Sequence, residues 1–405
     1  MMKKFKTNKG ITLVALVITI IVLLILAMVS ISIVMNQGII TKSKDAADKY
    51  NQKAEEEQEE LTFFERLLGQ YSGTDEASGD GDGATVETIT SEKINKVLSE
   101  TKNTKLKDEY GNKIVVPAGF KIKVEPDTNN ATHVTEGIVI QDKDNNEFVW
   151  IPVGNIKTSK EDTTGTPITL GRYVFKYDGT IDETLSQTAP DAQLKTNTST
   201  TYYYKEGSIE GIAVDSNGKA TKGYAKDINT FITSANNNGG YYLGRYEART
   251  STKRTASENA LTTLTENKND YVYNYVTQLQ ATERCQSMYT GKPFTSDLIN
   301  SYAWDTAILF IQTFGENSNY ANAHSVNTTS DGLAKKGTDS DKIRNIYDMA
   351  SNCYEWSTET FSYSRGPCTL RGGYYCSDDY TCNRIDNHSA PGGPKVFSFR
   401  PLLYV

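Results

Sequence analysis

The feature that constrains this chain most is an apolar stretch near its N-terminus. Residues 11–35 run without a single charged side chain, and four lysines precede them within the first nine residues. A helix that spans a membrane needs about 20 consecutive apolar residues, so this stretch is long enough to cross one. Lysines before a span favour a cytoplasmic N-terminal arm. The sequence therefore predicts a single-pass membrane protein whose remaining chain lies outside the cell.

A processing signal is expected at the start of this stretch. Gly10 directly precedes the apolar run that begins at Ile11, and the lysines lie before both. This arrangement resembles the signal of type IV prepilins. The resemblance implies a leader over residues 1–10, cleavage between Gly10 and Ile11 by a prepilin peptidase, and contact with the pilus assembly machinery. The family carries Glu where this chain has Ala15, so a pilus-tip position, retention in the membrane and an uncleaved anchor all stay open.

Three segments of different composition follow the predicted transmembrane helix at 11–35. Residues 36–70 are rich in Ala, Glu, Lys and Gln, which are strong helix formers, and they predict a helical stalk. Residues 71–90 are small, polar and rich in Gly, which is typical of a flexible linker. Residues 91–109 predict a short helix with Ser91 as its N-cap.

The remaining residues, 110–405, predict a large outer domain. Its pattern is that of an α+β fold with few helices and much irregular chain, and the polar residues 155–236 are expected to form long loops. Apolar runs between turn residues indicate strands, and three- and four-residue apolar spacing indicates helices. The predicted strands are 112–122, 137–153 with a hairpin at 142–146, and 239–248. The predicted helices are 277–288 and 296–314, the second capped at Thr295 or Ser296.

Composition excludes several classes of function. The chain has 43 Lys and Arg against 50 Asp and Glu, a net charge of −7, and no cationic cluster outside the first ten residues. Proteins that bind duplexes need a cationic face for the phosphates, so no nucleic acid partner is expected. Three histidines far apart in the chain argue against a Ser-His-Asp or histidine-based metal site. The absence of a CxxC pair argues against a zinc ribbon.

Six segments of the outer domain carry a family resemblance. In chain order they are FVWIPV (148–153), YYLGRYEA (241–248), TGKPFTSDLINSYAWDTA (290–307), NIYDMASNCYEW (345–356), LRGGYY (370–375) and FSFRPLLYV (397–405). Together they resemble the formylglycine-generating-enzyme-like (sulfatase-modifying factor) branch of the C-type lectin fold. The resemblance implies a compact domain whose first and last strands pair and whose last segment forms an exposed binding face.

Several residues of these segments are expected to have structural roles. Trp150, Trp304 and Trp356 are expected in the core. The sequence 371–373 predicts a tight turn in which a glycine supplies a positive φ angle. Phe399 and Arg400 are expected to lock the final strand in place.

The resemblance also bears on copper chemistry. Enzymes of this family bind copper through two cysteines after the RGG turn, where this chain has Cys376 and Cys382. Cys376 comes one residue early, the spacing to Cys382 is one residue longer, and Tyr374 replaces a serine of the family pattern. These departures predict that the chain is not an enzyme. A copper-dependent formylglycine-generating-type oxidase stays as one alternative and a structural minor pilin as another, and a disulfide between the two cysteines stays open.

Calcium is the other metal that the resemblance implies. The family holds it with side chains at the positions of Asp348 and Glu355 and with carbonyls at the positions of Ser351 and Cys353. Carboxylate and carbonyl oxygens are the ligands that Ca²⁺ prefers. The competing interpretation is that both carboxylates bond backbone donors in a turn. No cofactor is required for the function expected below.

The composition of residues 374–394 is unusual. None of them is Lys, Glu, Gln, Met or Trp, and all are encodable by codons that end in a pyrimidine. This resembles the diversified segment of variable proteins of diversity-generating retroelements, in which adenine-directed mutagenesis varies AAC codons. The alternative is an ordinary polar loop.

The same segment has the residue types of a recognition surface. Tyrosines offer rigid amphipathic contact area, and small polar residues offer adaptable hydrogen bonds, as in antibody paratopes. We therefore expect a membrane-anchored or pilus-associated receptor or adhesin that binds an external protein or glycan. The expected ligand-binding residues are Tyr374, Tyr375, Ser377, Asp378, Asp379, Tyr380, Asn383, Asp386, Asn387 and His388.

Overall fold

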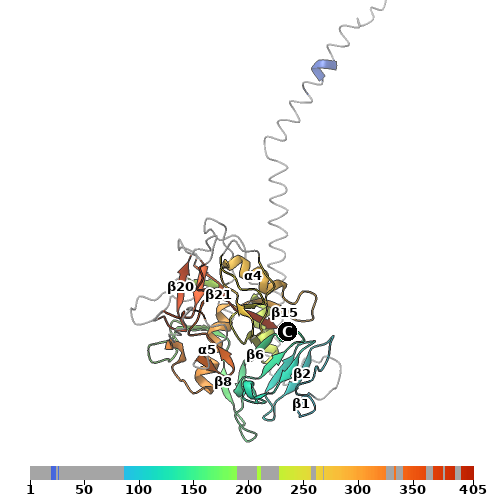
Figure 1. Ribbon diagram of the computed structural model, residues 1–405, viewed down its shortest axis with the longest axis vertical. Helices are drawn as coiled ribbons and strands as arrows, with labels where there is room; N and C mark the ends of the chain where they lie inside the picture. The colour runs from blue at the N-terminus through green and yellow to red at the C-terminus, as the bar shows by residue number, and fades with distance from the viewer. Residues whose placement is uncertain are drawn as a thin grey trace, which may run out of the picture. The chain divides into compact units, whose positions relative to one another are not determined.

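The computed structural model (Figure 1) divides the chain into two units, Met1–Ala84 and Thr85–Val405. For residues 208–210, 361, 386 and 387 it describes the backbone alone. The described residues are 20–23, 26, 86–188, 208–210, 228–256, 261–267, 269–324, 333, 341–361, 368–376, 379–387 and 394–405.

The first unit is described at five positions only. Residues 20–23 and 26 are helical, and their apolar side chains are about half exposed. They agree with the helix predicted there. Among the described residues, no helix is both long enough and apolar enough to cross a membrane. The rest of the predicted span, together with the predicted leader at 1–10 and stalk at 36–70, lies outside the described residues and stays a prediction.

The second unit is built on a six-stranded antiparallel sheet. Its strands lie in the order β15-β22-β12-β6-β5-β4, and every neighbouring pair is antiparallel. The residues of β5, β6, β12 and β22 are all buried. The strand bounds are β4 Lys121–Lys123, β5 Val139–Gln141, β6 Glu147–Pro152, β12 Gly240–Gly244, β15 Thr295–Leu298 and β22 Pro401–Tyr404.

Alternate residues of this sheet enter two different hydrophobic cores. Val149 and Ile151 of β6 pack into the core that includes helix α5, whereas Phe148 and Trp150 pack into a second core on the opposite face. Side chains along a strand alternate between its two faces, so a strand covered on both sides must be apolar at every position. This explains why FVWI in β6 has no polar residue. The core positions predicted for Trp150, Trp304 and Trp356 are confirmed, since each is at most 1% exposed.

The predicted helix at 296–314 begins later than expected. Helix α5 spans Ser301–Phe314, and its N-cap is Asn300, whose side-chain oxygen accepts the backbone N–H of Ala303 at 2.9 Å. Thr295 and Ser296, the expected caps, instead belong to β15. Residues 295–298 pair with β22, so strand pairing at the sheet outweighs a local capping signal.

Two further α-helices are described in the second unit; one confirms a prediction and the other contradicts one. Helix α4, Gln278–Ser287, confirms the predicted helix at 277–288 and begins with a capping box between Thr277 and Gln280. Helix α3, Ile228–Asn238, lies in the region expected to be loop, and it buries Phe231 and Ile232 in the α5 core. The region also holds β7 Gly154–Ile156, β8 Thr166–Ile168, β9 Gly171–Arg172, β10 Gln187–Thr188 and β11 Ser208–Glu210. Several of its described apolar residues, among them Ile168, Leu170 and Phe175, are buried, although the low apolar density of the region predicted loops.

The predicted short helix at 91–109 is wrong. Residues 91–100 run as turns along the edge of β4, and single β-bridges pair Ile94 with Ile122 and Val97 with Lys121. Asn95, at φ 56°, donates its backbone N–H to Ile122 O at 2.7 Å. The edge of β4 therefore accepts a backbone N–H that would otherwise bond a carbonyl within a helix. Further along, β2 Thr104–Lys107 pairs antiparallel with β3 Lys113–Val116 and parallel with β1 Glu87–Thr88. The strand β1 lies inside the predicted linker at 71–90.

A second sheet contains β19 and β20, the strands before and after the predicted ligand-binding loop. Its strands lie in the order β11-β18-β19-β20, and β21 pairs with β18 in parallel. β18 and β19 lie between β21 and β20 in this sheet, and in the view of Figure 1 these strands lie away from β1 and β2. The bounds are β18 Tyr354–Phe361, β19 Cys368–Arg371, β20 Arg384–Asn387 and β21 Phe397–Phe399. Four two-stranded pairs are also described: β7 with β8, β9 with β10, β13 Arg249–Thr250 with β14 Tyr271–Val272, and β16 Lys342–Ile343 with β17 Ile346–Tyr347.

The last strand differs from what the resemblance implied. β22 lies between β12 and β15, and all four of its residues are buried. It therefore does not pair with the first strands of the domain and forms no exposed face. The lock expected at Phe399 and Arg400 is confirmed: Phe399 is fully buried, and the Arg400 guanidinium donates to the carbonyls of Gly244 and Tyr347.

The turn after β19 yields a first prediction. Gly372 has φ +75°, as expected for the RGG turn, and a Cβ there would lie 2.5 Å from the carbonyl oxygen of Met349. Gly372→Ala should therefore cost at least about 2 kcal/mol of unfolding free energy, because the strain of a left-handed residue adds to a clash with backbone. Urea denaturation of the purified protein measures this cost.

Gly111→Ala is the matched control. Gly111 has φ +91°, but a Cβ there would meet nothing within 4 Å. Only the strain of about 1 kcal/mol should remain. Equal costs at the two positions would show that the close approach to Met349 is unimportant.

Candidate ligand-binding surface

The segment between β19 and β20 is part surface and part core. Tyr374 and Tyr375 are half-buried and Cys376 is exposed, and Asp379 and Tyr380 are again half-buried. Residues 381–384, which follow, are all buried. The expected recognition segment is therefore a surface loop that is anchored at its C-terminal end.

Three tyrosines form an aromatic cluster at the start of this loop. The rings of Tyr354 and Tyr374 have centroids 4.8 Å apart, and those of Tyr374 and Tyr375 are 5.6 Å apart and nearly perpendicular, at 87°. The ammonium group of Lys395 lies 5.9 Å from the ring centroid of Tyr375. We call Tyr354, Tyr374 and Tyr375 the tyrosine cluster. Such contacts between aromatic rings stabilise their relative positions, and all three residues are half-buried.

Tyr354 is a member that the sequence analysis missed. It is the first residue of β18 and was considered only as part of the segment 345–356. Its backbone N–H donates to Val396 O at 2.9 Å, and its ring also contacts Phe397. The antiparallel pairing of β18 with β19 brings it to the RGG turn, and no pattern within either segment shows this.

Asp379 folds the loop back onto the cluster. Its carboxylate accepts the hydroxyl of Tyr354, and it also accepts the side-chain amide of Asn383 at 3.0 Å. A Cβ on Gly373 would lie 2.7 Å from the carbonyl oxygen of Asp379, so the two backbone stretches touch. A second aromatic pair, Tyr380 and His324 at 5.7 Å, flanks this contact. The cluster and the loop therefore hold one another in shape.

A buried network of five charges lies beneath the loop. We call it the five-charge network, and its members are Arg172, Asp305, Glu359, Arg371 and Arg384, each at most 4% exposed. Arg371 donates to Asp305 at 2.5 Å and to Glu359 at 3.1 Å. Arg384 donates to Glu359 at 2.7 Å and also to Asp305, and Arg172 donates to Glu359 at 2.6 Å. Two carboxylates thus join three guanidinium groups.

This network ties five elements to one point. Asp305 comes from α5, Arg172 from β9, Glu359 from β18, Arg371 from β19 and Arg384 from β20. Burial lowers the pKa of Arg384, but the carboxylates of Asp305 and Glu359 outweigh burial and raise it above its usual value. Its guanidinium therefore stays charged and keeps β20 attached to the core.

The structure separates the predicted ligand-binding residues into three groups. Tyr374, Tyr375, Asp379 and Tyr380 are half-buried; the first two belong to the tyrosine cluster, Asp379 bonds it, and Tyr380 packs against His324. Asn383 is 6% exposed and bonds Asp379, which argues against direct ligand contact by its side chain. Ser377, Asp378 and His388 lie outside the described residues, as do Gly10 and Ile11, and only the backbone of Asp386 and Asn387 is described, in β20.

The two cysteines of the copper alternative lie in different environments. Both are free thiols, so the disulfide left open is not formed. Cys376 is exposed, whereas Cys382 is buried in the α5 core, and burial raises its pKa to about 12. Copper binding needs thiolates, so this arrangement gives the oxidase alternative no support.

The residues of the predicted calcium site are close in the fold but engaged otherwise. Both oxygens of Glu355 accept the guanidinium of Arg400, at 3.0 and 2.5 Å. Asp348 lies 3.8 Å from Arg249 and accepts the hydroxyl of Ser351 at 3.4 Å. Cys353 donates its backbone N–H to Glu247. Among the described residues, no group of three His, Cys, Asp or Glu side chains is arranged to hold a metal. Glu355 in this arrangement does not fit a calcium ligand, and the calcium site stays a prediction.

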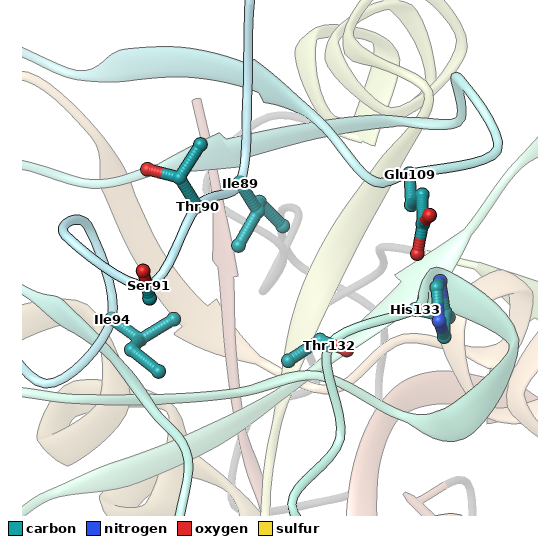
Figure 2. A pocket seen from close by; sticks show the side chains of 7 residues that line it. All are labelled: Ile89, Thr90, Ser91, Ile94, Glu109, Thr132 and His133. Atoms are coloured by element: carbon teal, nitrogen blue, oxygen red, sulfur yellow. The ribbon is translucent and has the colours of Figure 1, made fainter.

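A cavity lies elsewhere in the second unit, beside β1. It holds about 210 Å³, and Figure 2 shows Ile89 and Ile94 on one side and Glu109 with His133 on the other. The His133 ring stacks on Tyr110 at 4.1 Å. None of the predicted ligand-binding, metal or processing residues lines this cavity, so it is separate from the surface described above.

Comparisons with known proteins identify no family. No protein-family description matches the chain, and no curated protein matches it. Among solved structures, the chain is similar to Treponema denticola variable protein 1, with a TM-score of 0.32 and 11% sequence identity. The match covers 64% of this chain and 96% of that chain. At this TM-score the likeness supports neither a shared fold nor a shared function.

The five-charge network predicts unequal costs for losing an anion or a cation. Asp305→Asn should lower the free energy of unfolding by about 3–5 kcal/mol, because it leaves three buried guanidinium groups with one carboxylate. Arg384→Met should cost about 1–3 kcal/mol, because two cations and two anions remain but hydrogen bonds are lost. Urea denaturation of the purified variants measures both values.

Lys395→Met is the control for this pair of variants. Lys395 is exposed, and changes at such positions usually shift stability by less than about 0.5 kcal/mol. A larger cost for Arg384→Met than for Asp305→Asn would contradict the charge count of the network.

Buried glutamates beneath β12 predict a pH dependence of stability. Burial raises the pKa of Glu247 well above its ordinary value, and Asp348 and Glu355 add to the effect; burial also raises the pKa of Glu266. The folded chain therefore binds more protons than the unfolded chain above about pH 4.3, where free Glu titrates. Stability should fall as the pH rises from 5 to 8.

Glu247→Gln should make this fall smaller, since the amide cannot ionise. Urea denaturation at pH 5, 6, 7 and 8 measures the slope for each chain. Glu109→Gln is the control, because Glu109 is exposed and paired with Lys160, and it should leave the slope unchanged. A wild-type stability that rises over this range would show that Glu247 is already ionised at pH 5.

Proposed function

We propose that this chain is a bacterial surface receptor or adhesin, anchored in the membrane or associated with a pilus. Its outer domain, which we propose to be C-type lectin-like, binds an external protein or glycan through the loop between β19 and β20. In this proposal the protein has no enzymatic activity and requires no cofactor. The apolar run at 11–35 with lysines before it supports the anchor.

The tyrosine cluster is the observation that carries this proposal. Three half-buried rings, one from β18 and two from the loop after β19, lie together, and the carboxylate of Asp379 accepts the hydroxyl of one of them, Tyr354. Aromatic side chains with few rotatable bonds lose little entropy on binding, and for that reason tyrosine dominates paratopes. Their ordered packing here provides a surface that is formed before a ligand arrives.

The five-charge network supports the same proposal from below. A recognition loop must tolerate changes at its surface without unfolding the domain, and surface substitutions usually cost little when the support is rigid. Here the support is supplied by five elements that meet at Asp305 and Glu359. Folding and specificity are thereby assigned to different residues of one segment.

The neighbouring DNA tests the diversified nature of this surface. We expect a near-copy of the codons for residues 374–394 beside a reverse-transcriptase gene, with differences confined to adenines in the copy. Sequencing of the locus decides the matter. A locus with neither the copy nor the reverse transcriptase would return this stretch to an ordinary loop.

Removal of the tyrosine cluster should weaken adhesion. The double variant Tyr374→Ala/Tyr375→Ala should lose at least about tenfold in affinity, because buried aromatic anchors each contribute 2 kcal/mol or more at interfaces. The measurement is binding of the purified protein to arrays of bacterial surface proteins and glycans, followed by titration of the strongest wild-type binder.

Tyr177→Ala is the matched control, because Tyr177 is an exposed tyrosine far from the loop in sequence. It should bind as the wild type does. Unchanged binding by the double variant, with loss of fibre assembly instead, would favour the structural minor pilin.

A further inference from the structure

We propose that residues 381–384 form a fixed clamp that divides the predicted variable segment, so that within the described residues ligand recognition is restricted to 374–376 and 379–380. This inference deepens the proposed function and rests on it. It assigns two opposite roles to residues that the composition of the segment does not distinguish.

Burial is the first observation behind the clamp. Thr381, Cys382, Asn383 and Arg384 are 0, 1, 6 and 4% exposed, whereas Cys376, six residues before Cys382, is exposed. The side chain of Cys382 lies in the hydrophobic core with α5. Replacement of a residue at such a position with a larger or polar one must displace packed neighbours or bury an unpaired polar group.

Backbone hydrogen bonds are the second observation. Thr381 and Cys382 donate their N–H groups to the carbonyls of Ala323 and Ala321, at 3.0 and 2.9 Å. The indole N–H of Trp304 donates to Thr381 O at 2.9 Å, and the guanidinium of Arg371 donates to Asn383 O at 3.0 Å. The path of the clamp is thus fixed by groups from outside the segment.

The charge of Arg384 is the third observation. Its guanidinium donates to Asp305, to Glu359 and to the carbonyl of Tyr173 at 3.2 Å, so all of its directions are used within the core. Among the residues available from pyrimidine-ending codons, only arginine has a permanent positive charge with several donors. Variation at this codon would remove these hydrogen bonds from the buried carboxylates of Asp305 and Glu359.

The side chains of the surface stretches are less buried than those of the clamp. The tyrosine cluster contacts the rest of the domain through Tyr354 with Phe397, through Tyr375 with Lys395, and through a backbone bond from Tyr375 to Asn352 O at 3.1 Å. Its side chains can change while the clamp keeps the loop ends in position. The clamp therefore belongs to the residues that stabilise the domain, whereas the surface stretches contain the residues that recognise the ligand.

The experiment compares the same substitution at two cysteines of the full-length chain. Cys382→Lys should increase the rate of cleavage by a nonspecific protease at least about tenfold, because the buried ammonium group would lie near the guanidinium groups of Arg371 and Arg384. Cys376→Lys should stay within about threefold of the wild type. A second pair, Arg384→Asn and Tyr375→Asn, should show the same contrast. Equal protease resistance within either pair would overturn the clamp.

Natural variation provides an independent readout. Where the near-copy of the segment exists, its adenine differences should fall on codons for 374–376 and 379–380 and spare those for 381–384. Differences at the codon for Arg384 would overturn the clamp while leaving the proposed function intact. Absence of the copy would overturn the diversified surface alone, and the protease comparison would still decide on the clamp.

Discussion

The contact on which this fold depends most is the pairing of Asp305 and Glu359 with three buried arginines. Removing charges from water is costly, and a buried cluster is tolerable only when each charge has close partners. The cluster meets this condition by drawing on α5, β9, β18, β19 and β20. Hydrophobic packing alone would allow these elements to slide, whereas paired hydrogen bonds specify one register. The loop between β19 and β20 is thus held in a defined shape by buried charges.

Much of the strand pattern could be predicted from the sequence, and the reasons are local. The runs that became β3 to β6 and β12 are apolar between clear turn residues, and helix α4 has its capping residues at Thr277 and Gln280. Predictions failed where pairing with residues distant in the sequence determines the local structure. Residues 91–100 have helical spacing but bond the edge of β4, and Thr295 has a capping side chain but pairs with β22. At these places, hydrogen bonds to residues distant in the sequence outweigh the local preference for a helix.

The candidate surface shows the same division. Composition identified the tyrosines of the loop, because an excess of Tyr, Asp and Asn is visible without a fold. It did not identify Tyr354, which reaches the cluster from another strand, and it did not separate Cys376 from Cys382. Exposure is a property of the packed chain, so residues of one type in one segment can have opposite roles.

The central place of β22 has a consequence for how the domain is made. This strand comes from residues 401–404, yet it lies between β12 and β15 in the main sheet. During synthesis, β12 and β15 therefore lack their partner strand until residues 401–404 have been made. Until then the domain is vulnerable to aggregation through these strand edges, and a chaperone that binds exposed edges would protect it.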